Sequence, residues 1–107
     1  MNEENVIRHQ RLCDELNDLY ARKNHDYGDS FHKMFMEEGL AMIRIRLGDK
    51  FSRFKTLSRL NPGDSKQEVI DESIRDTLVD LANYALMTVM ELDELEANRN
   101  EPYHEGA

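Results

Sequence analysis

Residues 65–98 read SKQEVIDESIRDTLVDLANYALMTVMELDELEAN, a long stretch in which apolar residues recur every three or four positions. The recurring positions are Ile70, Ile74, Thr77, Leu78, Leu81, Ala85, Thr88, Leu92 and Leu95. This spacing gathers them on one face and is typical of an amphipathic helix that packs against a core. Ser65 and Glu68 have the spacing of a capping box, and Pro102 forbids continuation into the tail. The stretch therefore predicts a helix that ends near Asn98.

The same periodicity occurs in two earlier segments. In residues 5–22 it falls on Val6, His9, Leu12, Cys13, Leu16, Leu19 and Tyr20, and in residues 40–60 on Leu40, Ile43, Leu47, Phe51 and Phe54. Each segment predicts a helix. The sequence Asn61-Pro62-Gly63-Asp64 separates the second of these from the helix described above and is a strong stop signal.

Residues 23–30 lack periodicity and are rich in residues that favour turns, so we expect a loop of defined shape there. Phe31, Met34 and Phe35 then predict a short apolar turn, which Gly39 interrupts. No segment has the alternation of a strand. We therefore predict one all-α domain over residues 1–107, with three main helices and a tail that is mobile from about residue 100.

Composition limits the functions open to this chain. Its 107 residues include 39% apolar and 34% charged residues, and Met42 and Ile45 add a second apolar face to the helix at 40–60. Because a monomer would expose this surface, we expect a homodimer or a homotetramer. The 14 Lys plus Arg against 22 Asp plus Glu give a net charge of -8, which opposes general nucleic-acid binding. The single cysteine, the polar N-terminus and the lack of a long apolar run predict a cytoplasmic protein without a membrane span.

The helix at 65–98 also carries an unusual polar stripe. Its members recur at four, four and three residues: Glu72, Asp76, Asp80 and Asn83. Stacked acids on one helix side repel each other, so a positive partner is expected. Carboxylates one turn apart suit Mg²⁺ bridged to phosphates, with Asp49 of the preceding helix as a further candidate ligand. The alternative is that Arg or Lys of a neighbouring helix pairs with the acids.

Several residues have the chemistry needed for a nucleotide. In the expected loop, Lys23 and Asn24 offer donors, Asp26 an acceptor, Tyr27 a stacking ring and Gly28 a close backbone approach. In the helix at 40–60, Lys50 and Arg53 lie one turn apart and either hold phosphate oxygens or pair with the acid stripe. The four histidines lack the i, i+4 spacing of two metal ligands from one helix, and no nucleophile has a recognisable base partner.

Three separated motifs together resemble the nucleotide-modification-associated domain family, short proteins found mainly in bacteriophages and prophages. The motifs are Lys23-Asn24-His25-Asp26-Tyr27-Gly28 with Ser30-Phe31, Arg46-Leu47-Gly48-Asp49-Lys50 with Arg53, and Glu72-Ser73 through Asp76, Asp80, Asn83 and Tyr84. The resemblance spans about residues 16–92. It implies a context of nucleotide metabolism and DNA modification. We also expect Asn83 and Tyr84 of the third motif among the nucleotide contacts.

The chain is more loosely similar to the MazG-like all-α nucleoside triphosphate pyrophosphohydrolases, helical oligomers that hold Mg²⁺ with two acidic pairs. That similarity implies a helical bundle completed by oligomerisation, with Glu72 and Asp76 as the second pair, although they are four residues apart rather than three. The first pair is missing, because the middle of the helix at 40–60 offers only Asp49.

Three hypotheses follow from these observations. The leading one is a Mg²⁺-dependent nucleotide-handling protein, one form of which would hydrolyse a nucleoside or deoxynucleoside triphosphate to a monophosphate and pyrophosphate. The second is a non-catalytic nucleotide-binding or protein-interaction module, which the missing acidic pair favours. The third is a helical oligomer in which the acid stripe only forms ion pairs.

Overall fold

The computed structural model describes residues 2–27, 29–60 and 67–100 and contains four helices there. They are α1 (Asn2–Tyr27), α2 (Ser30–Glu38), α3 (Leu40–Ser58) and α4 (Gln67–Asn100). The described residues contain no strand, which confirms the all-α prediction. None of the described helices combines the length and apolar character needed to cross a membrane. The capping residue Ser65 and the tail beyond residue 100 lie outside the described residues.

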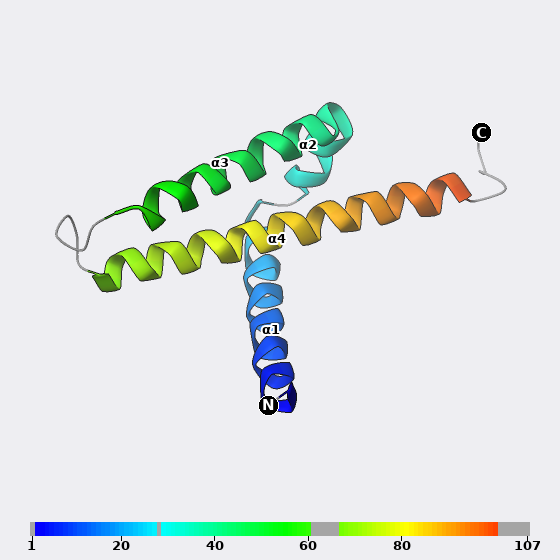
Figure 1. Ribbon diagram of the computed structural model, residues 1–107. Helices are drawn as coiled ribbons and strands as arrows, with labels where there is room; N and C mark the ends of the chain where they lie inside the picture. Colours follow the sequence, from blue (N-terminus) through cyan, green and yellow to red (C-terminus); the bar gives the residue numbers. More distant parts are fainter. Residues whose placement is uncertain (1, 28, 61–66, 101–107) are drawn as a thin grey trace.

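The helices form an elongated T (Figure 1). α3 and α4 run antiparallel and lie side by side, and they make the most extensive contact between helices. α2 is folded back at the beginning of α3, while α1 crosses α4 near its middle and projects away from it. The radius of gyration is 17.7 Å, whereas a compact chain of this length has about 13 Å. The single chain is therefore extended rather than globular.

Two predictions of local structure are wrong. The expected loop at 23–30 is helical as far as Tyr27, and Lys23 in this segment contacts Asp80 of α4, so tertiary context overrides the turn-favouring composition. The expected turn after it is a nine-residue helix, α2, so the described chain has four helices rather than three. Gly39 does interrupt the chain as predicted, with φ 64° and ψ −150°, a conformation that side chains other than glycine strongly disfavour.

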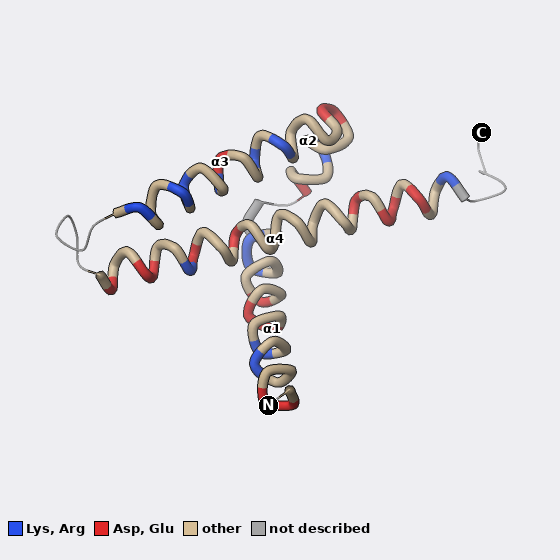
Figure 2. Tube along the Cα trace, viewed as in Figure 1, with Lys and Arg blue, Asp and Glu red and all other residues tan. Residues whose placement is uncertain are grey.

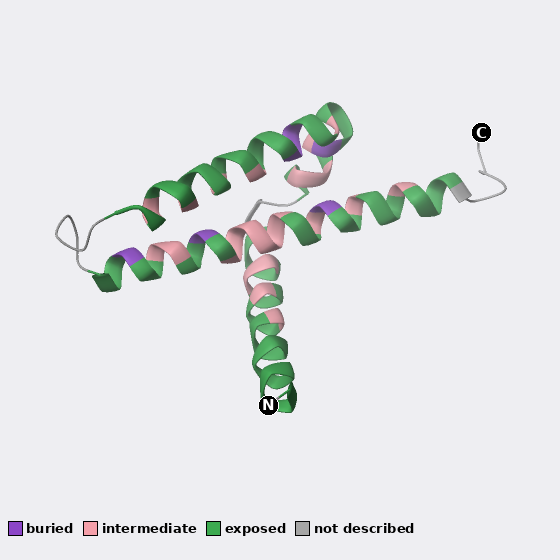
Figure 3. Ribbon diagram, in the orientation of Figure 1, coloured by how far each residue is buried: buried purple, intermediate pink, exposed green. Residues whose placement is uncertain are grey.

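The core is small and lies where α2, α3 and α4 meet. It consists of the buried Phe35, Met42 and Ile43, against which Phe31, Met34, Leu47 and Leu95 pack. Farther along α4, Ile70 and Thr77 are also buried. By contrast, Leu40 and Phe51 of the predicted apolar stripe are half or more exposed, at 50% and 55%. Figure 3 shows that most of α1 is exposed as well.

The two paired helices carry opposite charge. α3 has five basic residues (Arg44, Arg46, Lys50, Arg53, Lys55) and one acid (Asp49). α4 has two basic residues (Arg75, Arg99) and nine acids (Glu68, Asp71, Glu72, Asp76, Asp80, Glu91, Asp93, Glu94, Glu96). Figure 2 marks the Lys and Arg positions along α3 and the Asp and Glu positions along α4, which lies beside it. The positive partner that the acid stripe was expected to have is present at Asp80, which pairs with Lys50 of α3 and with Lys23 of α1.

Candidate functional site

A cavity of about 290 Å³ opens where the C-terminal turns of α1 meet the other three helices. Its lining residues are Tyr20, Lys23, Asn24, Ser30, Phe31, Met34, Met42, Arg46, Lys50, Asp80, Asn83, Tyr84 and Met87. The size is at the lower end of ordinary small-molecule pockets. The lining combines aromatic and thioether groups with a few charged ones, which is the composition of a site for an amphipathic anion.

Asp80 is the centre of the charged part. Its Oδ2 lies 3.1 Å from Lys50 Nζ on α3, and its Oδ1 lies 3.4 Å from Lys23 Nζ on α1. Only a quarter of the Asp80 side chain is exposed, against 30% for Lys50 and 55% for Lys23. One carboxylate therefore gathers an ammonium group from each of two helices at the cavity.

A third cation, Arg46, completes the set. Its guanidinium group contacts Met34 Sδ at 3.9 Å, and within the described ranges it has no carboxylate partner. The described part of the cavity lining thus holds three cations (Lys23, Arg46, Lys50) against one acid (Asp80). This local excess of positive charge stands in a chain whose net charge is -8.

The other side of the cavity is aromatic. The Phe31 and Tyr84 rings lie 6.1 Å apart between centroids at an interplanar angle of 43°, a separation in the range of favourable ring pairs. Tyr20 on α1 faces the same space. These rings offer flat apolar surface next to the cations.

Two polar contacts fix α1 against α4 at this point. Asn83 Nδ2 donates a hydrogen bond to the Leu16 carbonyl oxygen at 3.2 Å. Two turns away on α4, Arg75 donates to both carboxylate oxygens of Glu15 at 2.8 Å. These two hydrogen bonds are the main reason that the pKa of Glu15 is lowered and the pKa of Arg75 is raised. Asn83 therefore positions the helix that carries Lys23 rather than only lining the cavity.

The comparison with known families bears directly on this arrangement. Residues 23–92 match the nucleotide modification associated domain 1 family. The chain belongs to that family. The match begins at Lys23, so this domain includes every cavity residue except Tyr20. Searches of the curated proteins and of the solved structures found no match.

Six of the residues singled out from the sequence line the cavity of this nucleotide modification associated domain: Lys23, Asn24, Lys50, Asp80, Asn83 and Tyr84. Four others do not line it and are exposed: Asp49, Arg53, Glu72 and Asp76. Gly28 and the side chains of Asp26 and Tyr27 lie outside the described residues. The ion-pair alternative for the acid stripe is therefore realised at Asp80.

The sequence interpretation did not single out seven of the thirteen described lining residues. The residues not singled out for the site are Tyr20, Ser30, Phe31, Met34, Met42, Arg46 and Met87. Arg46, Ser30 and Phe31 did belong to the quoted family motifs, so motif membership was a signal that could have identified them. Tyr20 lies three and four residues before Lys23 and Asn24, so a helical rather than a looped reading of this segment would have put it on their face.

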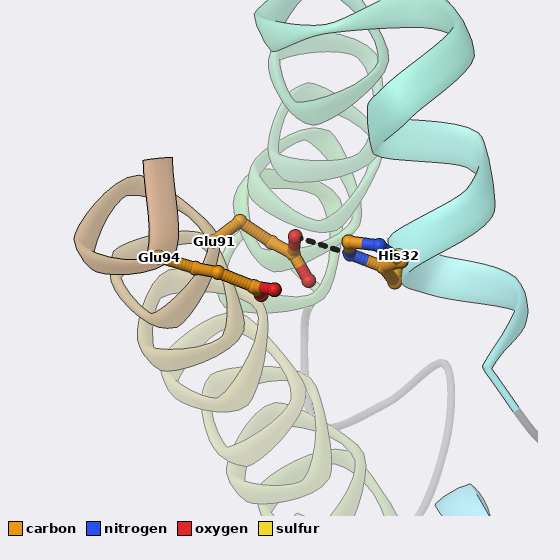
Figure 4. A group of neighbouring side chains, drawn as sticks. All are labelled: His32, Glu91 and Glu94. Atoms are coloured by element: carbon orange, nitrogen blue, oxygen red, sulfur yellow. Dashed lines mark hydrogen bonds and ion pairs between the residues drawn. The ribbon is translucent and has the colours of Figure 1, made fainter. Parts of the chain in front are cut away.

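A second group of ionisable side chains could hold a metal ion. His32 of α2 and Glu91 and Glu94 of α4 offer ligand atoms that all lie within 4.8 Å of one another (Figure 4). His32 Nδ1 and Glu91 Oε1 are 2.6 Å apart, and this hydrogen bond raises the pKa of His32. The spacing argument against a histidine site considered two ligands from one helix, whereas this group comes from two. In the described ranges, the acids predicted to hold metal form no such group of three.

Proposed function

We propose that the cavity binds the phosphate groups and base of a nucleotide or a nucleotide-derived small molecule. The carrying observation is the excess of three cations over one carboxylate at a cavity in an otherwise acidic chain. Lys23, Arg46 and Lys50 are the phosphate contacts in this proposal. The ammonium groups of the two lysines and the guanidinium group of Arg46 can together bind several phosphate oxygens.

Asp80 holds the two lysines while no phosphate is present. Because its carboxylate already contacts both Nζ atoms, the cations are oriented before the ligand arrives. Preorganisation of this kind reduces the cost of ordering side chains on binding. The base stacks against the aromatic side formed by Tyr20, Phe31 and Tyr84, with Asn24 and Asn83 as neighbouring polar groups.

The catalytic form of the proposal is Mg²⁺-dependent hydrolysis of a nucleoside or deoxynucleoside triphosphate. A water oxygen bonds to the α-phosphorus, the bond to the bridging oxygen breaks, and a monophosphate and pyrophosphate leave. Mg²⁺ is commonly held by one or two carboxylates together with substrate phosphates. Among the described lining residues, Asp80 is the one carboxylate that could take this role. Asp49, Glu72 and Asp76 are still predicted as metal ligands, and substitution of each residue would test this.

One observation favours the second candidate, a binding module without turnover. Among the lining residues that the structure describes, Asp80 is the sole acid, and two lysines already pair with it. A carboxylate held this way is a weaker metal ligand than a free pair. The family assignment to nucleotide modification is compatible with either form, and both use the cavity in the cytoplasm of a bacterial host.

The deciding experiment is incubation of the purified protein with each common NTP and dNTP, with Mg²⁺ or with EDTA, followed by chromatography of the products. Monophosphate that appears only with Mg²⁺ supports hydrolysis. Calorimetric binding without turnover across the panel supports the binding module. If no nucleotide of the panel is bound or turned over, the proposal as a whole is rejected.

We also propose that a second copy of this chain covers the exposed apolar surface. Large apolar side chains are half or more exposed on α1 (Val6, Ile7) and on α4 (Leu86, Val89, Met90). A projecting helix such as the first half of α1 gains little stability in water by itself. We therefore expect a homodimer or homotetramer by light scattering at micromolar concentration, and a monomer would contradict this.

A further inference from the structure

We propose that His32, Glu91 and Glu94 form a binding site for a divalent transition metal of the Zn²⁺ type, separate from the cavity, and that the bound ion ties α2 to α4. The group combines one imidazole with two carboxylates drawn from two helices. Figure 4 shows the three side chains converging, with both glutamates reaching from α4 toward the histidine on α2.

The placement of the ligands is set by packed helices. Glu91 and Glu94 are three residues apart, so they are neighbours on one helix face. Leu95, next to Glu94, packs against the core cluster, and Phe31 beside His32 does the same. The Glu91 side chain is only 12% exposed and that of His32 32%. Ligands supported in this way need little rearrangement to bind an ion.

The net charge of the three side chains distinguishes a metal site from an ordinary ion pair. The hydrogen bond between His32 and Glu91 accounts for two of the three groups. With a protonated imidazole, the two carboxylates still leave a net charge of minus one. A divalent ion coordinated by a neutral imidazole and both carboxylates leaves none, so it neutralises Glu94 as well.

The donor set indicates the class of metal. Imidazole nitrogen suits Zn²⁺ and similar transition ions, whereas Mg²⁺ is held by oxygen ligands and water. Three protein ligands leave one position for water, as in many zinc sites. The ion expected here therefore differs from the Mg²⁺ that would accompany a nucleotide.

The test is calorimetric titration of the full chain with ZnCl₂ and, separately, MgCl₂. The wild-type protein should bind Zn²⁺ more tightly than Mg²⁺. His32→Asn and Glu94→Gln should each weaken Zn²⁺ binding at least about tenfold, since loss even of an outer-shell partner often costs about 10- to 100-fold. Asp93→Asn is the matched control, because it removes the same charge from the exposed neighbour of Glu94, and should change the affinity less than about twofold.

Circular dichroism of each variant separates loss of the site from loss of the fold. Glu94 is exposed, so Glu94→Gln should stay folded even if His32→Asn does not. Equal losses in Glu94→Gln and Asp93→Asn would overturn the proposal, because they would reflect general charge alone. Equal affinity for Mg²⁺ and Zn²⁺ would overturn it as well.

Discussion

The cavity and the His32–Glu91–Glu94 group are both built on α4, but the two sites have opposite charge. At Asp80 one acid faces two lysines, with Arg46 nearby as a third cation. Eleven residues later, about 16 Å along the helix, two acids face one imidazole. The first arrangement attracts an anion and the second a cation. α4 is acidic at both places, so the difference comes from the helix opposite it.

This comparison shows why net charge is a poor guide to what this chain binds. The value of -8 opposes a long polyanion such as DNA. It says little about a small ligand, because exposed charges farther apart than about 10 Å are screened at ordinary ionic strength. The basic α3 creates its own local field, and α2 brings an imidazole instead. Two ligands of opposite charge can therefore be expected on one small domain.

The largest effect should come from reversing the charge at Lys50. Lys50→Glu changes the cavity from three cations and one acid to two of each, and it places two carboxylates side by side at Asp80. We expect nucleotide affinity to fall about a hundredfold, which corresponds to about 2.7 kcal/mol. Isothermal titration with the best-bound nucleotide of the panel measures this.

Lys55→Glu is the matched control for that change. Lys55 is on the same helix, is exposed and contacts the Phe51 ring rather than the cavity. If the local arrangement matters, Lys55→Glu should weaken nucleotide binding less than about threefold, and both variants should bind Zn²⁺ like the wild type. Equal losses of nucleotide binding would mean that only the overall charge of α3 counts, and the comparison would fail.

A smaller effect is expected from a substitution at Gly39. This residue connects α2, the helix of His32, to α3, the helix of Lys50. Gly39→Ala places a side chain at φ +64°, where the strain comes from the backbone because nothing lies within 4 Å of the new Cβ. We expect it to lower the free energy of unfolding by about 1 to 3 kcal/mol. Since Gly39 sets how α2 leaves α3, Zn²⁺ binding at His32 should weaken more than nucleotide binding at Lys50.

Gly48→Ala provides the control for the glycine substitution. Gly48 is in the interior of α3, and its added Cβ also meets nothing within 4 Å. Alanine there should raise the free energy of unfolding by about 0.5 to 1 kcal/mol, because glycine loses more freedom in a helix. Urea unfolding of both variants gives the two values. A stabilised Gly39→Ala would contradict the strain ascribed to that turn.

The sequence predicted the long helices well because their periodicity is local. α3 and α4 were expected at 40–60 and 65–98 and occur at Leu40–Ser58 and Gln67–Asn100. The end of α1 was missed because Asn24, Asp26 and Gly28 favour a turn by composition. In the folded protein the segment is helical and Lys23 contacts Asp80, 57 residues away. No local pattern contains that information.

The candidate sites divide along the same line. Asp80 was found because it belongs to a polar stripe with helical spacing. Lys50 was found because it lies one turn from Arg53 and has the charge to pair with that stripe or to bind phosphate. Glu72 and Asp76 share the stripe of Asp80, but α1 crosses α4 near Asn83, so the cavity includes only the end of the stripe. The pairing of His32 with Glu91 spans 59 residues and two helices, and intrahelical spacing could not reveal it.

The smallest effect should come from Glu15 and Arg75, which fasten α1 beside the cavity. The lowered pKa of Glu15 means that its ionised form is favoured in the folded protein. Its contribution is therefore complete above the unfolded pKa, near 4.5, and is lost as the pH falls through the lower folded value. The difference in unfolding midpoint between wild type and Glu15→Gln should thus be small but measurable at pH 7 and should vanish in acid. Because the pair is exposed, salt should shrink the difference too. Asp14→Asn, which removes a charge from the neighbouring position, should show a smaller dependence, and an equal one would mean that the bidentate contact does not hold α1 in place.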